Sequence, residues 1–233
     1  MLFRSANMDR VARSRWYMAL ALAVAMAGCL GMLVMRASVT GKVELRLLVW
    51  NLFLAAIPFP VAWLVDVLGR RRRIRGWALV VPTLVWLLFF PNAPYLVTDL
   101  IHLRPTSAVP LWYDGLVFFA FASTGLLLGF SSLYLVPSTV ARRLGDLWGW
   151  GTAFAAIGLG SYGIYLGRVE RWNSWDVLRH PRLLFHSVRS QVEAPLSSRS
   201  ALVLTLGFAV FLTTVYAILY AFANLLRVDD RRL

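Results

Sequence analysis

The sequence predicts an all-α, polytopic integral membrane protein: a bundle of six transmembrane helices with a short broken or interfacial helix after the third. Hydrophobic residues make up 59 % of the 233 residues, and the mean hydropathy is +0.66. Soluble domains are only about 45–50 % apolar. The apolar residues also gather into runs of about 20, the length that a helix needs to cross a bilayer. The predicted spans are approximately 16–35, 45–68, 77–92, 111–136, 147–166 and 200–226.

The whole chain, 1–233, is predicted to form a single membrane domain. Its longest polar stretch, 167–199, is too short to build a hydrophobic core of its own. The net charge of +13 would indicate nucleic-acid binding in a soluble protein. Here the arginines lie between the apolar runs, where they orient helices and meet anionic lipid. The predicted partner is therefore membrane lipid, and nucleic acid is excluded.

The arginines also predict the orientation, because cytoplasmic loops of membrane proteins are enriched in Lys and Arg. The strongest signal is the five-arginine cluster after the second span, Arg70 to Arg73 and Arg75. With this cluster inside, both termini are cytoplasmic. Asp66 is interpreted as one half of a surface ion pair with Arg70 or Arg73. Tryptophans prefer the headgroup region, and four of them fall at the inner interface: Trp16, Trp77, Trp148 and Trp150.

Cys29, the single cysteine, excludes an intrachain disulfide and a cysteine-based metal site. The basic N-terminus and the apolar run that reaches Cys29 have the pattern of a lipoprotein signal. The chain stays apolar as far as Met35, however, which favours an uncleaved first transmembrane helix. The sequence leaves lipidation of Cys29 open.

Prolines interrupt the second and third spans. Pro58 and Pro60 lie within the second span, which is therefore expected to kink. Pro91 and Pro94 end the third helix, and segment 94–103 beyond them is predicted to re-enter the membrane or to lie on its surface. A second interfacial segment, 174–192, is basic and amphipathic and is interrupted by Pro181.

Three polar clusters are predicted to meet at the outer face around the broken third helix. The first is Asn92, Tyr95, Asp99 and His102, the second is Tyr113 and Asp114, and the third is the segment 167–176. Asp99 and His102 are the candidate catalytic, proton-transfer pair, and the spacing places both on one helix face with Tyr95. Arginines can hold a phosphate or carboxylate, and amide and phenol groups can orient a substrate. The candidate ligand-binding residues are Asn92, Tyr95, Asp114, Arg168, Glu170, Arg171, Asn173 and Asp176.

Simpler interpretations stay open for the third of these clusters. Asn173 and Asp176, three residues apart, have the spacing of a helix cap with a reciprocal acid. Glu170 can pair with Arg168 or Arg171 at a helix end. No metal site is predicted, because two of the three histidines lie six residues apart in a basic stretch, which is poor ligand geometry. The sequence identifies no cofactor.

The fifth span is rich in glycine, and small residues let membrane helices approach closely. The helix is therefore expected to be the most buried of the bundle. An alternative is that it packs against a protein partner or a second copy of the chain. Its glycines are Gly149, Gly151, Gly158, Gly160, Gly163 and Gly167.

Four strings of residues resemble a bacterial membrane-protein family known as domain of unknown function 1361. They are Trp50-Asn51-Leu52-Phe53-Leu54-Ala55, the run from Phe90 through Pro91-Asn92-Ala93-Pro94-Tyr95 to Leu100, Trp112-Tyr113-Asp114, and Gly167-Arg168 with Arg171-Trp172-Asn173-Ser174-Trp175-Asp176. The resemblance covers roughly Leu45 to Phe222. It implies a multi-pass protein of the bacterial inner membrane and supplies no activity.

Three functions fit the sequence. The first is an outer-face polar site that binds or converts an amphiphile, lipid-like or lipid-linked; the sequence does not decide between an enzyme and a binding protein. The second is a small transporter that uses the kinked second and broken third helices as moving parts. The third is a non-catalytic assembly partner that packs through the glycine-rich fifth helix.

Overall fold

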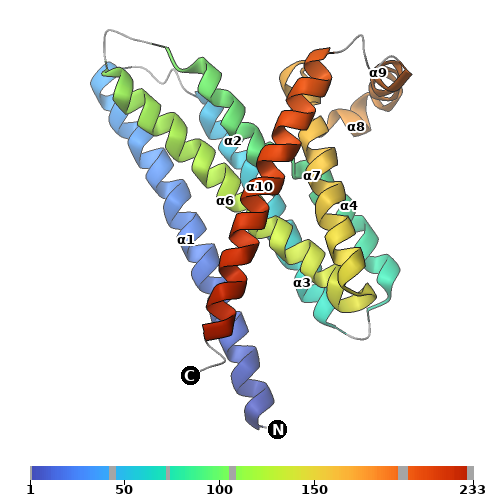
Figure 1. Cartoon of the computed structure of the whole chain (residues 1–233). Helices are drawn as coiled ribbons and strands as arrows, with labels where there is room; N and C mark the ends of the chain where they lie inside the picture. Colours follow the sequence, from blue (N-terminus) through green and yellow to red (C-terminus); the bar gives the residue numbers. More distant parts are fainter. Residues whose placement is uncertain (1, 42–45, 72–73, 105–108, 194–198, 230–233) are drawn as a thin grey trace. The chain divides into compact units, whose positions relative to one another are not determined.

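The computed structural model describes residues 2–41, 46–71, 74–104, 109–193 and 199–229, and within these ranges it contains helices and no strand. The all-α prediction is confirmed there. Figure 1 shows the elements in chain order. They are α1 (Leu2–Thr40), α2 (Arg46–Ala56), α3 (Pro58–Arg70), η1 (Gly76–Leu79), α4 (Val80–Phe89), α5 (Asn92–Tyr95), η2 (Leu96–His102), α6 (Leu111–Leu144), α7 (Asp146–Arg168), α8 (Asp176–Arg179), α9 (Pro181–Glu193) and α10 (Arg199–Asp229).

Five helical segments of the described chain are long and apolar enough to cross a membrane. They are Arg13–Thr40, Arg46–Arg70, Gly76–His102, Leu111–Leu144 and Ala201–Ala223. These segments correspond to five of the six predicted spans. The remaining one, 147–166, lies within the continuous helix α7. Its many glycines add little apolar surface, and it is not among the five. The count of six spans therefore stays a prediction.

The predicted proline kink is a break between two helices. A turn at Ile57 separates α2 from α3, and Pro58 is the first residue of α3. Proline suits that position, because the first amide of a helix has no partner within the helix and the missing N–H costs nothing. The second candidate span, Arg46–Arg70, thus consists of the two short helices α2 and α3 in succession.

A second break interrupts the third candidate span, Gly76–His102. A turn at Phe90 and Pro91 follows α4, and the chain continues through α5 into η2, a 3₁₀ helix. Three residues make one turn of a 3₁₀ helix, so Asp99 and His102 share a face and Tyr95 is rotated away from them. The prediction that all three lie on one α-helical face is wrong for this reason.

The chain forms two compact units, each made from two separate stretches. Unit 1 comprises 1–56 and 92–129, and unit 2 comprises 57–91 and 130–233. Because the stretches alternate along the chain, the units are not successive domains. The units are described separately below.

In unit 1, α1 runs antiparallel to the first part of α6. The Sγ of Cys29 lies 3.3 Å from Oγ1 of Thr124, and the hydroxyl of Tyr113 donates to the carbonyl oxygen of Met32 at 2.8 Å. Residues further along α1 thus contact residues earlier in α6, as expected for antiparallel helices. Cys29 is buried in the middle of the continuous helix α1. The short helix α2 packs against α5 and η2.

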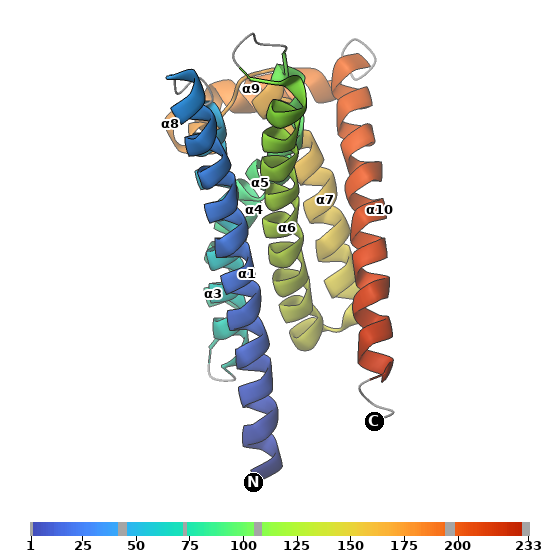
Figure 2. The same ribbon diagram turned by 90° about the vertical axis from the view of Figure 1, so that its left-hand side faces the viewer.

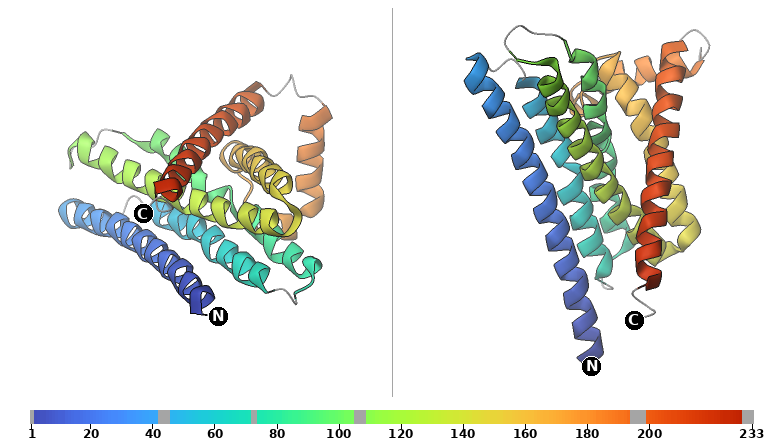
Figure 3. Two further views of the ribbon diagram at one scale, coloured as in Figure 1. Left: turned by 60° about the horizontal axis from the view of Figure 1, so that its bottom comes forward. Right: turned by 60° about the vertical axis from the view of Figure 1, so that its left-hand side comes forward.

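In unit 2, α3 packs against α4, and α7 packs against α10. Both views in Figure 3 show α3 and α4 side by side. Close packing of α7 depends on its glycines: a Cβ at Gly160 would lie 2.7 Å from the ring of Phe90, and one at Gly163 would lie 2.6 Å from Pro91. Figure 2 shows α9 lying crosswise to α7 and α10.

Candidate functional site

Asp99 lies in unit 1 just beyond the proline break, and its side chain is buried. The Nδ2 of Asn51, on α2, donates a hydrogen bond of 2.7 Å to Oδ2 of Asp99. His102 is exposed one 3₁₀ turn later, and Asn92 and Tyr95 are half-buried. The broken helix therefore holds a buried carboxylate against α2 and leaves the histidine at the surface.

Asp114 is held by an arginine that sequence analysis did not select. The Nε of Arg36 donates to Oδ1 of Asp114 at 2.6 Å, and Nη2 donates to Oδ2 at 3.1 Å. The two side chains are only 3 % and 5 % exposed. Arg36 was placed beyond the end of the first span, but α1 continues to Thr40, so the arginine is part of the helix. Asp114 thus has a structural role in unit 1.

The third polar cluster lies in unit 2, and its acidic groups Glu170 and Asp176 each accept a hydrogen bond from a nearby residue. The backbone N–H of Asn173 donates to Oδ2 of Asp176 at 2.8 Å, so the predicted contact is present, but Asn173 is not the cap, because the N-cap residue of α8 is Trp175. The hydroxyl of Tyr165 donates to Oε1 of Glu170 at 3.0 Å. Arg171 has a left-handed backbone, with φ of 60°, and its side chain is exposed. Arg168, the last residue of α7, is half-buried.

The predicted site residues thus divide between the two units. Asn92, Tyr95, Asp99, His102 and Asp114 belong to unit 1. Arg168, Glu170, Arg171, Asn173 and Asp176 belong to unit 2. Their convergence on one site stays a prediction. Across the part of the chain that the structure describes, no group of three or more His, Cys, Asp or Glu side chains is suited to hold a metal ion.

The predicted ion pair of Asp66 with Arg70 is present, but the carboxylate of Asp66 is buried and does not lie at the surface. Its side chain is 1 % exposed. The Nε of Arg70 donates to Oδ2 at 3.2 Å, Oγ1 of Thr139 donates to Oδ1 at 3.2 Å, and Nη2 of Arg142 also bonds Oδ1. The deciding partners lie on α6, more than 70 residues further along the chain, where local spacing gives no signal. Arg73, the other predicted partner, lies outside the described residues.

Arg143, the neighbour of Arg142, closes the end of α3. Its guanidinium donates hydrogen bonds of 3.0 Å to the carbonyl oxygens of Gly69, Arg71 and Ile74. The last carbonyls of a helix have no partner within the helix. The Arg143 side chain of α6 therefore supplies hydrogen-bond donors to carbonyl oxygens at the end of α3 and in the chain that follows it.

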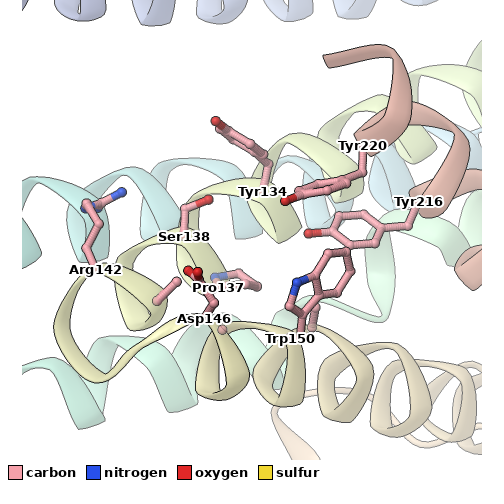
Figure 4. A pocket seen from close by; sticks show the side chains of 11 residues that line it. Tyr134, Pro137, Ser138, Arg142, Asp146, Trp150, Tyr216 and Tyr220 are labelled. Atoms are coloured by element: carbon pink, nitrogen blue, oxygen red, sulfur yellow. The ribbon is translucent and has the colours of Figure 1, made fainter. Parts of the chain in front are cut away.

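A pocket of about 370 Å³ lies between α6, α7 and α10 of unit 2. Each helix contributes side chains four residues apart, which share a helix face. Tyr134, Ser138 and Arg142 come from α6, Asp146 and Trp150 from α7, and Tyr216 and Tyr220 from α10; Pro137, Ala141, Gly149 and Ala153 complete the lining. Figure 4 shows the hydroxyls of Tyr216 and Tyr220 and the indole nitrogen of Trp150 turned toward the space shared with Ser138.

Four polar groups in this pocket have no partner among the described residues. The hydroxyls of Ser138, Tyr216 and Tyr220 and the indole N–H of Trp150 make no hydrogen bond there. Tyr216 is only 8 % exposed. The fully buried side-chain polar atoms without a partner in the described chain are Nε1 of Trp86 and Oγ1 of Thr205, so the four pocket groups are open to the pocket, where water or the polar part of a ligand can bond them.

The comparison with protein families gives one match. A model described as "Protein of unknown function (DUF1361)" matches residues 50–215. The chain belongs to the DUF1361 family. A search of the curated proteins and a search of the solved structures returned no match.

The DUF1361 match confirms the resemblance that the sequence predicted. It covers Asp99, Asp114 and the 167–176 segment, and it covers the α6 and α7 walls of the pocket, whereas Tyr216 and Tyr220 lie just beyond it. Sequence analysis missed the pocket, although Tyr216 and Tyr220 are one helical turn apart in an apolar span. That spacing is the signal that was available. Trp150, predicted to lie at the inner membrane interface, lines the pocket.

Proposed function

We propose that this DUF1361 protein binds an amphiphile whose polar head enters the pocket between α6, α7 and α10. The observation that carries the proposal is the hydroxyl of Tyr216, which lies on a side chain 8 % exposed, faces the pocket and has no hydrogen-bond partner among the described residues. Polar groups inside a membrane span are costly and are kept for a function. A ligand head with donors and acceptors satisfies them.

The helices around the pocket suit the apolar part of such a ligand. Both α6 and α10 contain segments that qualify as membrane spans. Leu206 and Val210 of α10 are exposed, and in a bilayer they contact acyl chains. An amphiphile can therefore keep its tail in the lipid while its head occupies the pocket, and no catalytic group is required.

In the proposed orientation the pocket opens at the cytoplasmic end of the bundle. Arg142 and Arg143 lie at the end of α6 beside the pocket, and the positive-inside rule places that end in the cytoplasm. With α7 as a sixth span, both termini are cytoplasmic and the membrane is the bacterial inner membrane. The amphipathic helix α9, crosswise to α7 and α10, then lies along the outer interface.

Replacing Tyr216 by leucine is expected to weaken lipid binding about tenfold, because the aromatic face and the hydroxyl are lost together. Tyr216→Phe, which keeps the ring, is expected to lose less. The probe is dihexanoyl phosphatidylethanolamine, titrated into protein in maltoside micelles and counted by native mass spectrometry. Trp148→Leu is the control, because Trp148 is on α7 two residues from Trp150 but is exposed and outside the lining. Equal binding by wild type and Tyr216→Leu would refute the proposed function.

Single cysteines are expected to report the proposed orientation. Leu144→Cys, at the exposed end of α6, should react with an impermeant maleimide only from the cytoplasmic side of vesicles. His102→Cys and Arg171→Cys should react only from the opposite side. The native Cys29 is buried, which gives a low background. Reaction of positions 102 and 171 from different sides would eliminate the outer-face site, and reaction of position 144 from the outer side would reverse the orientation.

The outer-face site around Asp99 and His102 is a second proposal. It is supported by a buried carboxylate one 3₁₀ turn from an exposed histidine on a proline-broken helix. In this proposal Asp99 and His102 exchange a proton with an amphiphile, and Arg168 and Arg171 hold its anionic group. The internal pairing of Asp114 with Arg36 leaves that aspartate little freedom to bind a ligand.

The transporter proposal is supported by the positions at which the chain passes from one unit to the other. The chain passes between them at the turn before Pro58, at the turn around Pro91 and beside Gly129 in α6. Two of the three connections are thus helix breaks, which suit moving elements.

If α7 binds a protein partner, only some of its glycines are available for the contact. Gly160 and Gly163 pack inside unit 2, whereas a Cβ at Gly151 or Gly158 would meet nothing within 4 Å. A partner helix or a second copy of the chain would therefore approach the Gly151–Gly158 face.

A further inference from the structure

We infer that the pocket between α6, α7 and α10 selects a zwitterionic head in which a phosphate and an ammonium group are joined, as in phosphoethanolamine lipids. This inference rests on the proposed function and adds the ligand class. It follows from the opposite chemistry of two pocket walls, one on α6 and one on α7.

The α6 wall is suited to an anion. Arg142 uses only Nη2 for its bonds to Asp66 and Thr139, and its side chain is 39 % exposed. The Nε–H and Nη1–H groups make no bond with any residue that the structure describes. The group of Asp66, Arg70 and Arg142 contains two positive charges and one negative charge, so a phosphate at Arg142 balances the remaining charge. Ser138, one turn away, adds a hydroxyl donor.

The α7 wall is suited to a cation. Asp146 and Trp150 are one helical turn apart and thus share a face. The carboxylate of Asp146 forms no ion pair with any described residue. The indole of Trp150 packs against the rings of Tyr216 and Tyr220, with centroids 6.1 and 4.8 Å away. A carboxylate beside clustered aromatic rings is the combination that binds ammonium groups.

Asp146 also lies in the first turn of α7, where a negative charge favours the helix by itself. A helix-terminal role predicts a change in stability alone, whereas a ligand role predicts a change in selectivity. The two roles are therefore separable by measurement.

The test compares two short-chain lipids that differ only in the head: dihexanoyl phosphatidylethanolamine and dihexanoyl phosphatidylglycerol. Both carry the phosphate, and only the first carries the ammonium group. Dissociation constants are measured by native mass spectrometry on the full chain in maltoside micelles. We expect the wild type to bind the ethanolamine lipid about fivefold more tightly, the effect of one additional partly exposed charge contact.

Asp146→Asn should reduce this preference to near one, and Asp146→Glu should retain it. Arg142→Lys keeps a cation for Asp66 but removes the Nε and Nη1 donors, and it should weaken binding of both lipids severalfold. Melting of each variant in the same micelles shows whether it is folded.

The outcomes separate the inference from the proposed function. Equal wild-type affinity for the two lipids, with both weakened by Tyr216→Leu, overturns the zwitterion inference and leaves the pocket as a lipid site. A preference that survives Asp146→Asn in a folded variant also overturns the inference. Affinities that Tyr216→Leu and Trp150→Leu do not change refute the proposed function itself.

Discussion

Replacing Asp114 by alanine is expected to cost about 3–5 kcal/mol of folding free energy, the range measured when one partner of a buried ion pair is removed. The variant leaves the guanidinium of Arg36 in a site where its side chain is 3 % exposed, without the carboxylate that accepts two of its hydrogen bonds. In a membrane span, water cannot easily replace that carboxylate. The loss is measured by unfolding the purified protein in mixed detergent micelles and following its helical circular dichroism.

The double variant Arg36→Met, Asp114→Leu is the matched control. Replacing both members of a buried pair by apolar residues is often neutral or stabilising, so the double variant should recover most of the stability. Asp146→Ala should stay within about 1 kcal/mol of wild type, because Asp146 is exposed and interacts mainly with its helix end. A loss below 1 kcal/mol for Asp114→Ala would show that the pair does not hold α1 to α6.

Replacing Gly125 by valine is expected to destabilise the protein by about 3 kcal/mol, the upper part of the range for overpacking. A Cβ at this position of α6 would lie 2.5 Å from the carbonyl oxygen of Ala93 and 2.7 Å from a methyl of Leu96. Ala93 stands between Pro91 and Pro94, so the backbone that must yield is restricted. The same unfolding measurement applies.

Gly31→Ala is the control for this substitution. A Cβ at Gly31, on α1, would meet nothing within 4 Å, and exchanging a helical glycine for alanine gains about 0.5–1 kcal/mol. The two variants should therefore change stability in opposite directions. Gly125→Val with wild-type stability would mean that the α5 segment does not pack against α6 as the structure shows.

Local patterns in the sequence were sufficient for the helices and their interruptions. The apolar runs predicted five segments that the structure bears out as candidate spans. Pro58, Pro91 and Pro181 each marked a break or the start of a helix, because a proline acts on its own turn of backbone. The Asn173–Asp176 contact was predicted as one of two interpretations, since it joins residues only three apart.

Contacts between distant residues were beyond the reach of the sequence. Asp66 has partners on α6, and Asp114 has its partner on α1, and no local spacing indicates either pair. The pocket depends on three helix faces that meet only in the fold. For the same reason, the residues of the predicted outer-face site were selected by the chemistry of their side chains, because the sequence does not show which of them lie close together.

The alternation of the two units along the chain has a consequence for biosynthesis. Unit 1 needs residues 92–129, and unit 2 already begins at residue 57. While the ribosome is still synthesising α6, neither unit is complete. The helices already inserted in the bilayer therefore lack packing partners that have not yet been synthesised. A truncated gene product that ends before α6 would therefore contain no finished unit, and quality-control proteases would be expected to degrade it.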